Sequence, residues 1–315
     1  MRFTILYASK LPGFPAFQPL KLTRNKLLKM YKKIKIIIVF FLSIAVLLWF
    51  LVPANAYVLQ GPHLLELMIK NIGTTKSLFV SQKLVFYDDS FQGGSIELKE
   101  TLKYIFPEKF RSDIVSKNSK RIHVVSKGRS LTVIDGKTVA GHETLFDRYK
   151  DIILYNSRSA LLQRLAHLGI NVSVSSLGRF QNKPVYVLGA QYPDESVSQV
   201  WLNKDTFRPF RWLINSKKAG GRPDGRIDTL EVRYFRWRKI SKIWYPMHIE
   251  FYQDDNLIRM IEVDEIKVAP GFSAALFDIN RLKSTYPKDT QLLQRQPGEL
   301  SEVQKMIEEF KKIYE

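Results

Sequence analysis

The side chains that could do chemistry are few and scattered in this sequence. None of the histidines has an i, i+4 histidine partner or the nearby carboxylates of a metal-binding helix. His142 and Glu143 come nearest, but adjacent residues point to different faces. We interpret each histidine as a surface or half-buried strand residue. The five are His63, His123, His142, His167 and His248.

The other patterns that could mark a catalytic or cofactor site are also missing. No G-x-S-x-G nucleophile motif occurs. The glycine-rich stretch 220–225 lacks phosphate-loop spacing and carries Pro223 where a backbone donor would be needed. The Asp88-Asp89 and Asp254-Asp255 pairs are typical of turns. The chain has no cysteine, which excludes disulfides, thiol catalysis and lipidation of an N-terminal cysteine. We therefore expect no enzyme activity, cofactor or metal, with a secreted hydrolase as the alternative from another class.

The distribution of charge along the chain argues against nucleic-acid binding. The chain carries a formal +19, but residues 1–56 hold nine Lys and Arg and no acidic residue. The rest has 40 basic against 30 acidic residues, and these mix along the predicted strands. A mixed, moderately basic surface suits anionic membranes or acidic partners better than a nucleic acid.

The N-terminal region reads as an export signal. From Met30 the sequence shows a Lys-rich start, an apolar run over 36–52 and Ala54-Asn55-Ala56 as a cleavage site. We hypothesise that translation starts at Met30 and that 1–29 is an upstream extension. The alternative is an uncleaved membrane anchor, since the apolar run is near the lower limit for a bilayer span. In both cases, everything after residue 57 would be exported.

The most regular stretch of the chain is Ile96 to Phe106. Apolar residues alternate with polar ones, and Glu100 is the single polar residue on the apolar face. Period two over this length predicts a β-strand with one wet and one apolar face. Pro107 ends it because proline has no N–H to donate. Such a strand needs either a core or an apolar ligand against its apolar face.

The remaining patterns predict more strands, interrupted by helices. A short helix over 61–73 precedes them, and about ten antiparallel strands follow in sequence. Residues 144–169 have helical leucine spacing, so two helices are expected across the open side of the sheet. The fold class expected is α+β: a strongly curved antiparallel sheet, or incomplete β-barrel, with a helical lid over an apolar cavity. The expected parts are an upstream extension at 1–29, a signal peptide or membrane anchor at 30–56 and the half-barrel domain at 57–282. A linker at 283–298 and an amphipathic helix at 299–315 follow.

Four motifs in order resemble one known family. They are YIFPEKFRSDI followed by LTVIDGKTV, then VWLNKDTFRPFRW, IWYPMHIEFY and IEVDEIKVAPGFSAALFDI. Together they resemble the periplasmic lipoprotein carriers and outer-membrane lipoprotein-sorting (Lol-type) proteins over roughly residues 60–280. The resemblance implies a half-barrel whose helical lid covers a cavity for acyl chains. It also implies that Arg111, by hydrogen bonding to carbonyls, latches the lid to the barrel.

The cavity lining is predicted from the apolar faces of these strands. In a carrier, the tryptophans of the strands would line the cavity around the ligand. The alternatives are that they pack in the core or stack against the bases of a nucleic acid. The expected lining residues are Leu98, Leu102, Tyr104, Phe106, Phe110, Ile114, Val133, Trp212, Met247 and Ile249.

The function expected is therefore a monomeric periplasmic carrier that binds acyl chains of lipids or lipoproteins for transfer toward the outer membrane. The resemblance implies an inner-membrane transporter and an outer-membrane acceptor as partners, and no nucleic acid. The alternative within the same fold is an inner-membrane-anchored, lipid-sensing regulatory protein. Retention of the apolar segment in the mature protein would favour that alternative.

Overall fold

The computed structural model describes residues 24–49, 58–87, 94–116, 119–139, 143–216 and 228–288. The chain divides into two units, 1–57 and 58–315. The first contains α1 (Arg24–Trp49), which overlaps the expected leader. Within the described ranges, no helix is both long enough and apolar enough to cross a bilayer. The assignment of α1 as a leader or anchor stays a prediction. The expected helix at 299–315 lies outside the described residues.

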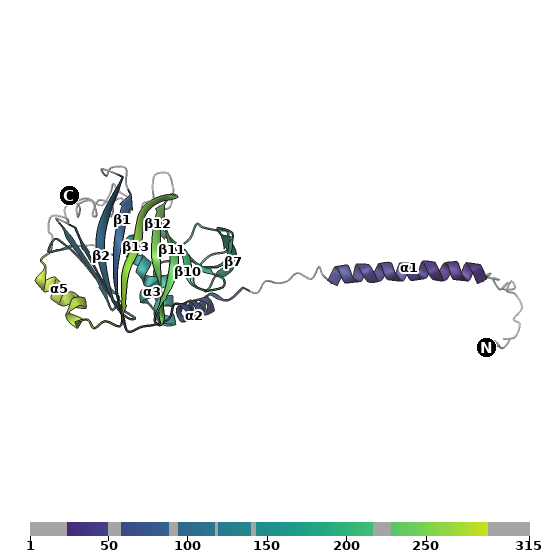
Figure 1. Cartoon of the computed structure of the whole chain (residues 1–315), viewed down its shortest axis with the longest axis horizontal. Helices are drawn as coiled ribbons and strands as arrows, with labels where there is room; N and C mark the ends of the chain where they lie inside the picture. Colours follow the sequence, from purple (N-terminus) through teal and green to yellow (C-terminus); the bar gives the residue numbers. More distant parts are fainter. Residues whose placement is uncertain are drawn as a thin grey trace, which may run out of the picture. The chain divides into compact units, whose positions relative to one another are not determined.

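The second unit is built on one antiparallel sheet of thirteen strands (Figure 1). Its order is β6-β5-β4-β3-β2-β1-β13-β12-β11-β10-β9-β8-β7. The first meander runs from the middle of the sheet to one edge, and the second runs from the other edge back to the middle, where β13 pairs with β1. The strands are β1 Ser77–Tyr87, β2 Ser95–Ile105, β3 Lys109–Val115, β4 Lys120–Ser126, β5 Arg129–Ile134, β6 Lys137–Val139, β7 Ser175–Phe180, β8 Lys183–Leu188, β9 Gln199–Asn203, β10 Pro209–Ser216, β11 Asp228–Ile240, β12 Ile243–Gln253 and β13 Asn256–Val268.

The α+β class and the antiparallel sheet are confirmed, and the expected strong curvature is not. The sheet is neither closed nor strongly curled. Its end strands, β6 and β7, are short and each pairs with one neighbour. Helices cover the apolar surface instead, so burial does not require the sheet to roll up. The alternating stretch is β2, as predicted, and each residue from Ser77 to Tyr87 of β1 pairs with it in unbroken register.

The helices of this unit lie before, between and after the two meanders. Residues 144–169 form a 3₁₀ helix, η1 (Leu145–Lys150), continued by α3 (Asp151–Leu154) and then α4 (Arg158–His167). We call Leu145–His167 the lid. The others are α2 (Gly61–Ile72), η2 (Ala274–Phe277) and α5 (Ile279–Thr285), so the expected linker at 283–298 begins inside a helix.

Local sequence explains where these helices begin and end. The Ser157 hydroxyl accepts a hydrogen bond from the Ala160 N–H and so caps α4. Gly73 ends α2 at φ +83°, where a Cβ would lie 2.0 Å from the Lys242 carbonyl oxygen. Only glycine fits that approach. It fixes α2 beside the start of β12.

The sheet is covered on both faces. Its inner face carries the large core, to which the lid and α2 contribute apolar side chains. On the outer face, η2 and α5 cover part of β4 and β5 with Phe277, Ile279 and Leu282. A third cluster on β8 and β9 surrounds Trp201. Figure 1 shows α5 beside the β2 side of the sheet, apart from α2 and α3.

Candidate ligand-binding site

Most of the predicted lining residues meet on the inner face of the sheet. Leu98, Leu102, Tyr104, Phe110, Ile114, Trp212 and Ile249 are buried members of the inner core, and Phe106 packs against it. The two exceptions are Val133 and Met247. Val133 lies on the outer face with the α5 side chains, and Met247 is half-buried and belongs to none of the buried clusters.

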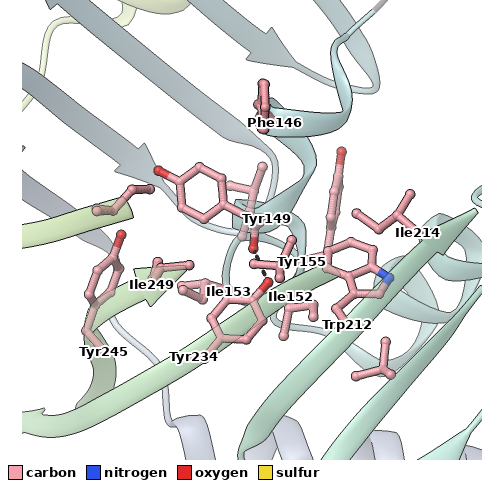
Figure 2. Close-up of a cluster of buried hydrophobic side chains, with 14 of the residues drawn as sticks. Phe146, Tyr149, Ile152, Ile153, Tyr155, Trp212, Ile214, Tyr234, Tyr245 and Ile249 are labelled. Atoms are coloured by element: carbon pink, nitrogen blue, oxygen red, sulfur yellow. Dashed lines mark hydrogen bonds between the residues drawn. The ribbon is translucent and has the colours of Figure 1, made fainter. Parts of the chain in front are cut away.

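The lid occupies the space expected to be a cavity. Figure 2 shows lid side chains pointing at the sheet residues Trp212, Tyr234 and Ile249. All are buried, as are Ile152, Ile153 and Leu154 of α3. The Phe146 ring packs edge-on against Phe251, with centroids 5.6 Å apart. The inner face is therefore a packed core in this state, and an acyl chain there must displace lid side chains.

Beneath the lid, a polar group interrupts the apolar face. Glu100 is 4% exposed and accepts hydrogen bonds from Gln82 and Ser112, which lie on the neighbouring strands. The Gln82 amide also donates to the Tyr149 hydroxyl of the lid, at 3.1 Å. Burial raises the pKa of Tyr149 well above its usual value, so the phenol stays neutral. Glu100 thus belongs to the inner face and links three strands to the lid.

One buried ion pair joins the lid directly to the sheet. The Arg121 guanidinium of β4 donates from Nη1 and Nη2 to the two carboxylate oxygens of Asp147 in η1, at 3.1 and 2.7 Å. Although burial alone would raise it, the charge of Arg121 holds the pKa of Asp147 well below its usual value. Bidentate pairing of this kind fixes geometry as well as charge. We call Arg121–Asp147 the lid latch.

A second charged network lies within the lid. Lys150 is fully buried, and its ammonium donates to Glu143 and lies 3.4 Å from Asp151. Arg164 of α4 donates to the same two carboxylates, with Nε 2.6 Å from Asp151. Burial opposes the charge on Lys150, but Asp151 and Glu143 outweigh it and raise the Lys150 pKa. This network ties η1, α3 and α4 into one body.

The tyrosine hydroxyl of Tyr234 supplies a further contact between β11 and the lid. It donates to the Tyr149 carbonyl oxygen at 2.9 Å, and Figure 2 shows the two residues facing each other. The lid is therefore attached by a small number of directional polar contacts above an apolar interface.

Arg111 is not the latch that the family resemblance implied. Its Nη2 pairs with Asp113 at 2.7 Å, and its Nη1 donates to the Leu276 carbonyl oxygen at 3.0 Å. In β3, Phe110 and Ser112 face the inner core, so Arg111 between them faces outward. It fastens η2 to the outer face of the sheet, on the side away from the lid.

The residues missed by sequence reasoning are Arg121 and the charged lid residues. One signal was present: Asp147, Lys150 and Asp151 are spaced i, i+3 and i+4, so opposite charges lie next to one another on one side of the helical stretch. Where such a side is buried, its charges must be paired. Two of the histidines lie on different strands and have different partners. The His123 ring of β4 forms a hydrogen bond of 2.9 Å with the Thr132 hydroxyl, whereas the His248 ring forms one of 2.8 Å with the Glu250 carboxylate on β12. In the described part of the chain, no three His, Asp or Glu side chains could hold a metal ion.

Acid should destabilise this domain because several carboxyl groups have lowered pKa values when folded. Those of Asp113, Asp147 and Glu231 are lowered by their arginine or lysine partners, against burial. Such groups stabilise the fold above the unfolded pKa, at about 4, and lose that contribution as the pH falls toward the folded value. Asp151, whose pKa is raised by burial, acts in the opposite sense.

We therefore expect urea midpoints to fall between pH 5 and pH 3. The change should be smaller in Asp147→Asn, which lacks one of the lowered groups. A midpoint that rises toward pH 3 would contradict the ion pairing described.

Comparisons with known proteins found solved structures that are similar to this chain at low sequence identity. The chain is similar to a protein domain from Vibrio parahaemolyticus that is described as outer membrane lipoprotein-sorting, at 11% identity and TM-score 0.47. The match covers 70% of this chain and 97% of that one. The chain is also similar to a DUF1329 family protein from Desulfovibrio piger at 14% identity and TM-score 0.47, covering 71% and 98%. A LolA superfamily protein from Nitrosomonas europaea matches at 12% identity and TM-score 0.43, covering 70% and 99%. No protein-family model matches the sequence, and no curated protein does.

Proposed function

We propose that this protein is a periplasmic carrier that binds acyl chains of lipids or lipoproteins between the sheet and the lid, without covalent chemistry. The observation that carries the proposal is the construction of the lid. It covers an apolar sheet face with apolar side chains, yet is fixed to the sheet by the Arg121–Asp147 latch and a few hydrogen bonds.

The energetics of such a site favour transfer over permanent binding. Burying an acyl chain contributes about 0.8 kcal/mol per methylene, so a chain of about sixteen could gain on the order of 13 kcal/mol as a ceiling. Displacing the lid costs free energy and lowers the apparent affinity in proportion to the population of the open state. A closed lid that competes with the ligand therefore permits release to an acceptor.

Export and partnership complete the proposal. The leader at 30–56 would direct residues 57 onward to the periplasm, where 57–282 act as the carrier domain. The sequence resemblance suggests loading by an inner-membrane transporter and delivery to an outer-membrane acceptor. With no cysteine for lipid attachment, the mature chain suits the mobile carrier better than a tethered acceptor.

The proposal is tested by native mass spectrometry. The chain is expressed with its own leader, purified from the envelope without detergent and mixed with a bacterial lipid extract. A carrier should show a one-to-one adduct whose lipid is released with its mass unchanged. Bare protein under conditions that keep the fold intact would overturn the proposal, and a hydrolysed lipid would favour the hydrolase alternative.

A further inference from the structure

A pocket of about 530 Å³ opens at the edge of the lid. It lies between the β4–β5 hairpin, the lid and the segment that leads into β9, and all three contribute to its walls. A second pocket of about 440 Å³ is lined by several of the same residues, including Tyr155 and Arg164, and reaches Lys127. We call the first of these the headgroup pocket.

The headgroup pocket borders the inner core. Val125 and Tyr155 line it and are also buried members of that core, and Leu168 lines it and packs against the core. A chain that replaces lid side chains on the inner face would therefore meet this pocket at the lid edge. The polar end of the same molecule would then lie in the pocket.

The uncompensated charge in the pocket is positive. Arg148 of η1 lines it and is half-buried, and within the described residues it forms no ion pair. Its Nε atom is buried without a hydrogen-bond partner. The one carboxylate in the wall, Glu143, already accepts hydrogen bonds from Lys150 and Arg164. Because the Arg148 guanidinium is half-buried and has no anionic partner among the described residues, an anion in the pocket would be stabilised by it.

Hydroxyl groups also line the pocket. Ser198 accepts the Asn215 N–H at 2.9 Å, so its own proton remains available to a ligand. Ser130 and Ser196 add two more hydroxyls to the lining. One planar guanidinium with neutral hydroxyl donors suits a singly charged oxyanion, either a phosphodiester or a carboxylate.

We propose that the headgroup pocket binds the anionic headgroup of the lipid whose acyl chain lies beneath the lid. This inference rests on the proposed carrier function and names its ligand class. Arg148 is the residue that selects a headgroup with an oxyanion over an uncharged one, through charge-assisted hydrogen bonding from its guanidinium. The adjoining pocket gives room for a larger headgroup substituent.

The test compares two lipids with the same acyl chain, used below the concentrations at which they aggregate. Lysophosphatidylglycerol carries a phosphodiester anion, whereas the matching monoacylglycerol carries no charge. The protein should bind the anionic lipid about tenfold more tightly, as one charge-assisted hydrogen bond permits. Arg148→Gln should abolish this preference, whereas Arg148→Lys should keep part of it.

Arg158→Gln is the matched control. It removes the same charge from an exposed position on α4, where Arg158 lies 3.8 Å from Glu66, outside the pocket lining. The control should keep the wild-type preference. Loss of the preference in Arg158→Gln as well would show a general charge effect and overturn the site.

The remaining outcomes separate the possible failures. Equal binding of lysophosphatidylglycerol and the monoacylglycerol overturns the headgroup site but leaves the carrier function standing. Binding of neither overturns the carrier function itself. Inorganic phosphate should displace lysophosphatidylglycerol only weakly; if it binds as tightly as the lipid, the pocket is a site for free phosphate and the lipid assignment is wrong.

Discussion

Replacing Arg121 by methionine is expected to lower the free energy of unfolding by about 3–5 kcal/mol, because removing one partner leaves the other charge buried. Asp147 is 7% exposed and would lose both guanidinium hydrogen bonds. The methionine retains much of the buried stem volume, so the cost reflects the charge more than a cavity. Urea unfolding of the mature protein at neutral pH measures it.

The same substitution should tighten the binding of an acyl probe. Since the latch holds the lid over the inner face, each 1.4 kcal/mol of docking free energy lost raises the apparent affinity about tenfold, until the lid is mostly open. The double variant Arg121→Met with Asp147→Asn removes the unpaired charge and should recover part of the stability. If the free energy of unfolding of Arg121→Met lies within about 0.5 kcal/mol of the wild-type value, the latch contributes little to stability.

The second large effect is expected from Phe146→Ala. This ring is fully buried in η1 and packs against Phe86 and Phe251, with centroids 6.4 and 5.6 Å away. Truncating a buried phenylalanine typically costs about 3–5 kcal/mol. The vacated volume lies between the lid and the sheet, so an acyl probe should bind more tightly even though the protein is less stable.

Phe277→Ala provides the comparison for Phe146. Phe277 is 2% exposed and packs in the outer cluster, against β4 and β5 rather than beneath the lid. Both variants should lose similar stability in urea, and only Phe146→Ala should gain affinity for the probe. Equal gains in the two variants would mean that binding follows general loosening, and the lid would have no special role.

The elements that the sequence predicted well are those with one covered face. β2 alternates cleanly because its outer face meets water, with Glu97 and Lys99 exposed. The lid helices were visible in the leucine spacing of α4, and the Asp254-Asp255 turn occurs where predicted. A period of two or of 3.6 identifies an element when only one side is apolar.

The errors arise where both faces of the sheet are covered. In β4, Ile122 and Val124 face outward against η2 and α5, whereas Arg121 and His123 face inward beneath the lid. Read alone, the pattern of β4 puts the apolar residues inside and the arginine outside, which reverses the real arrangement. Val133 was misplaced for the same reason, since it pairs with Ile122 in the register of β4 and β5.

Register and tertiary pairing account for the other departures. Val172 and Val174 are spaced as in a strand, but the chain turns there and β7 begins at Ser175. The choice of Arg111 as latch depended on family resemblance, and the partner of an arginine depends on which elements pack over its face. The sequence alone cannot state that η2 covers Arg111 and the lid covers Arg121.

The most direct test of acyl-chain binding beneath the lid is quenching of tryptophan fluorescence by a lipid brominated in the middle of its acyl chain. Trp212 is fully buried on the inner face, and Trp201 is 2% exposed in the third cluster, on β8 and β9. Bromine quenches indole only near contact, so the bound lipid should quench the wild type and Trp201→Phe but should lose most of its effect on Trp212→Phe. Quenching that survives in Trp212→Phe and disappears in Trp201→Phe, or no quenching by a lipid that binds, would contradict an acyl site between sheet and lid.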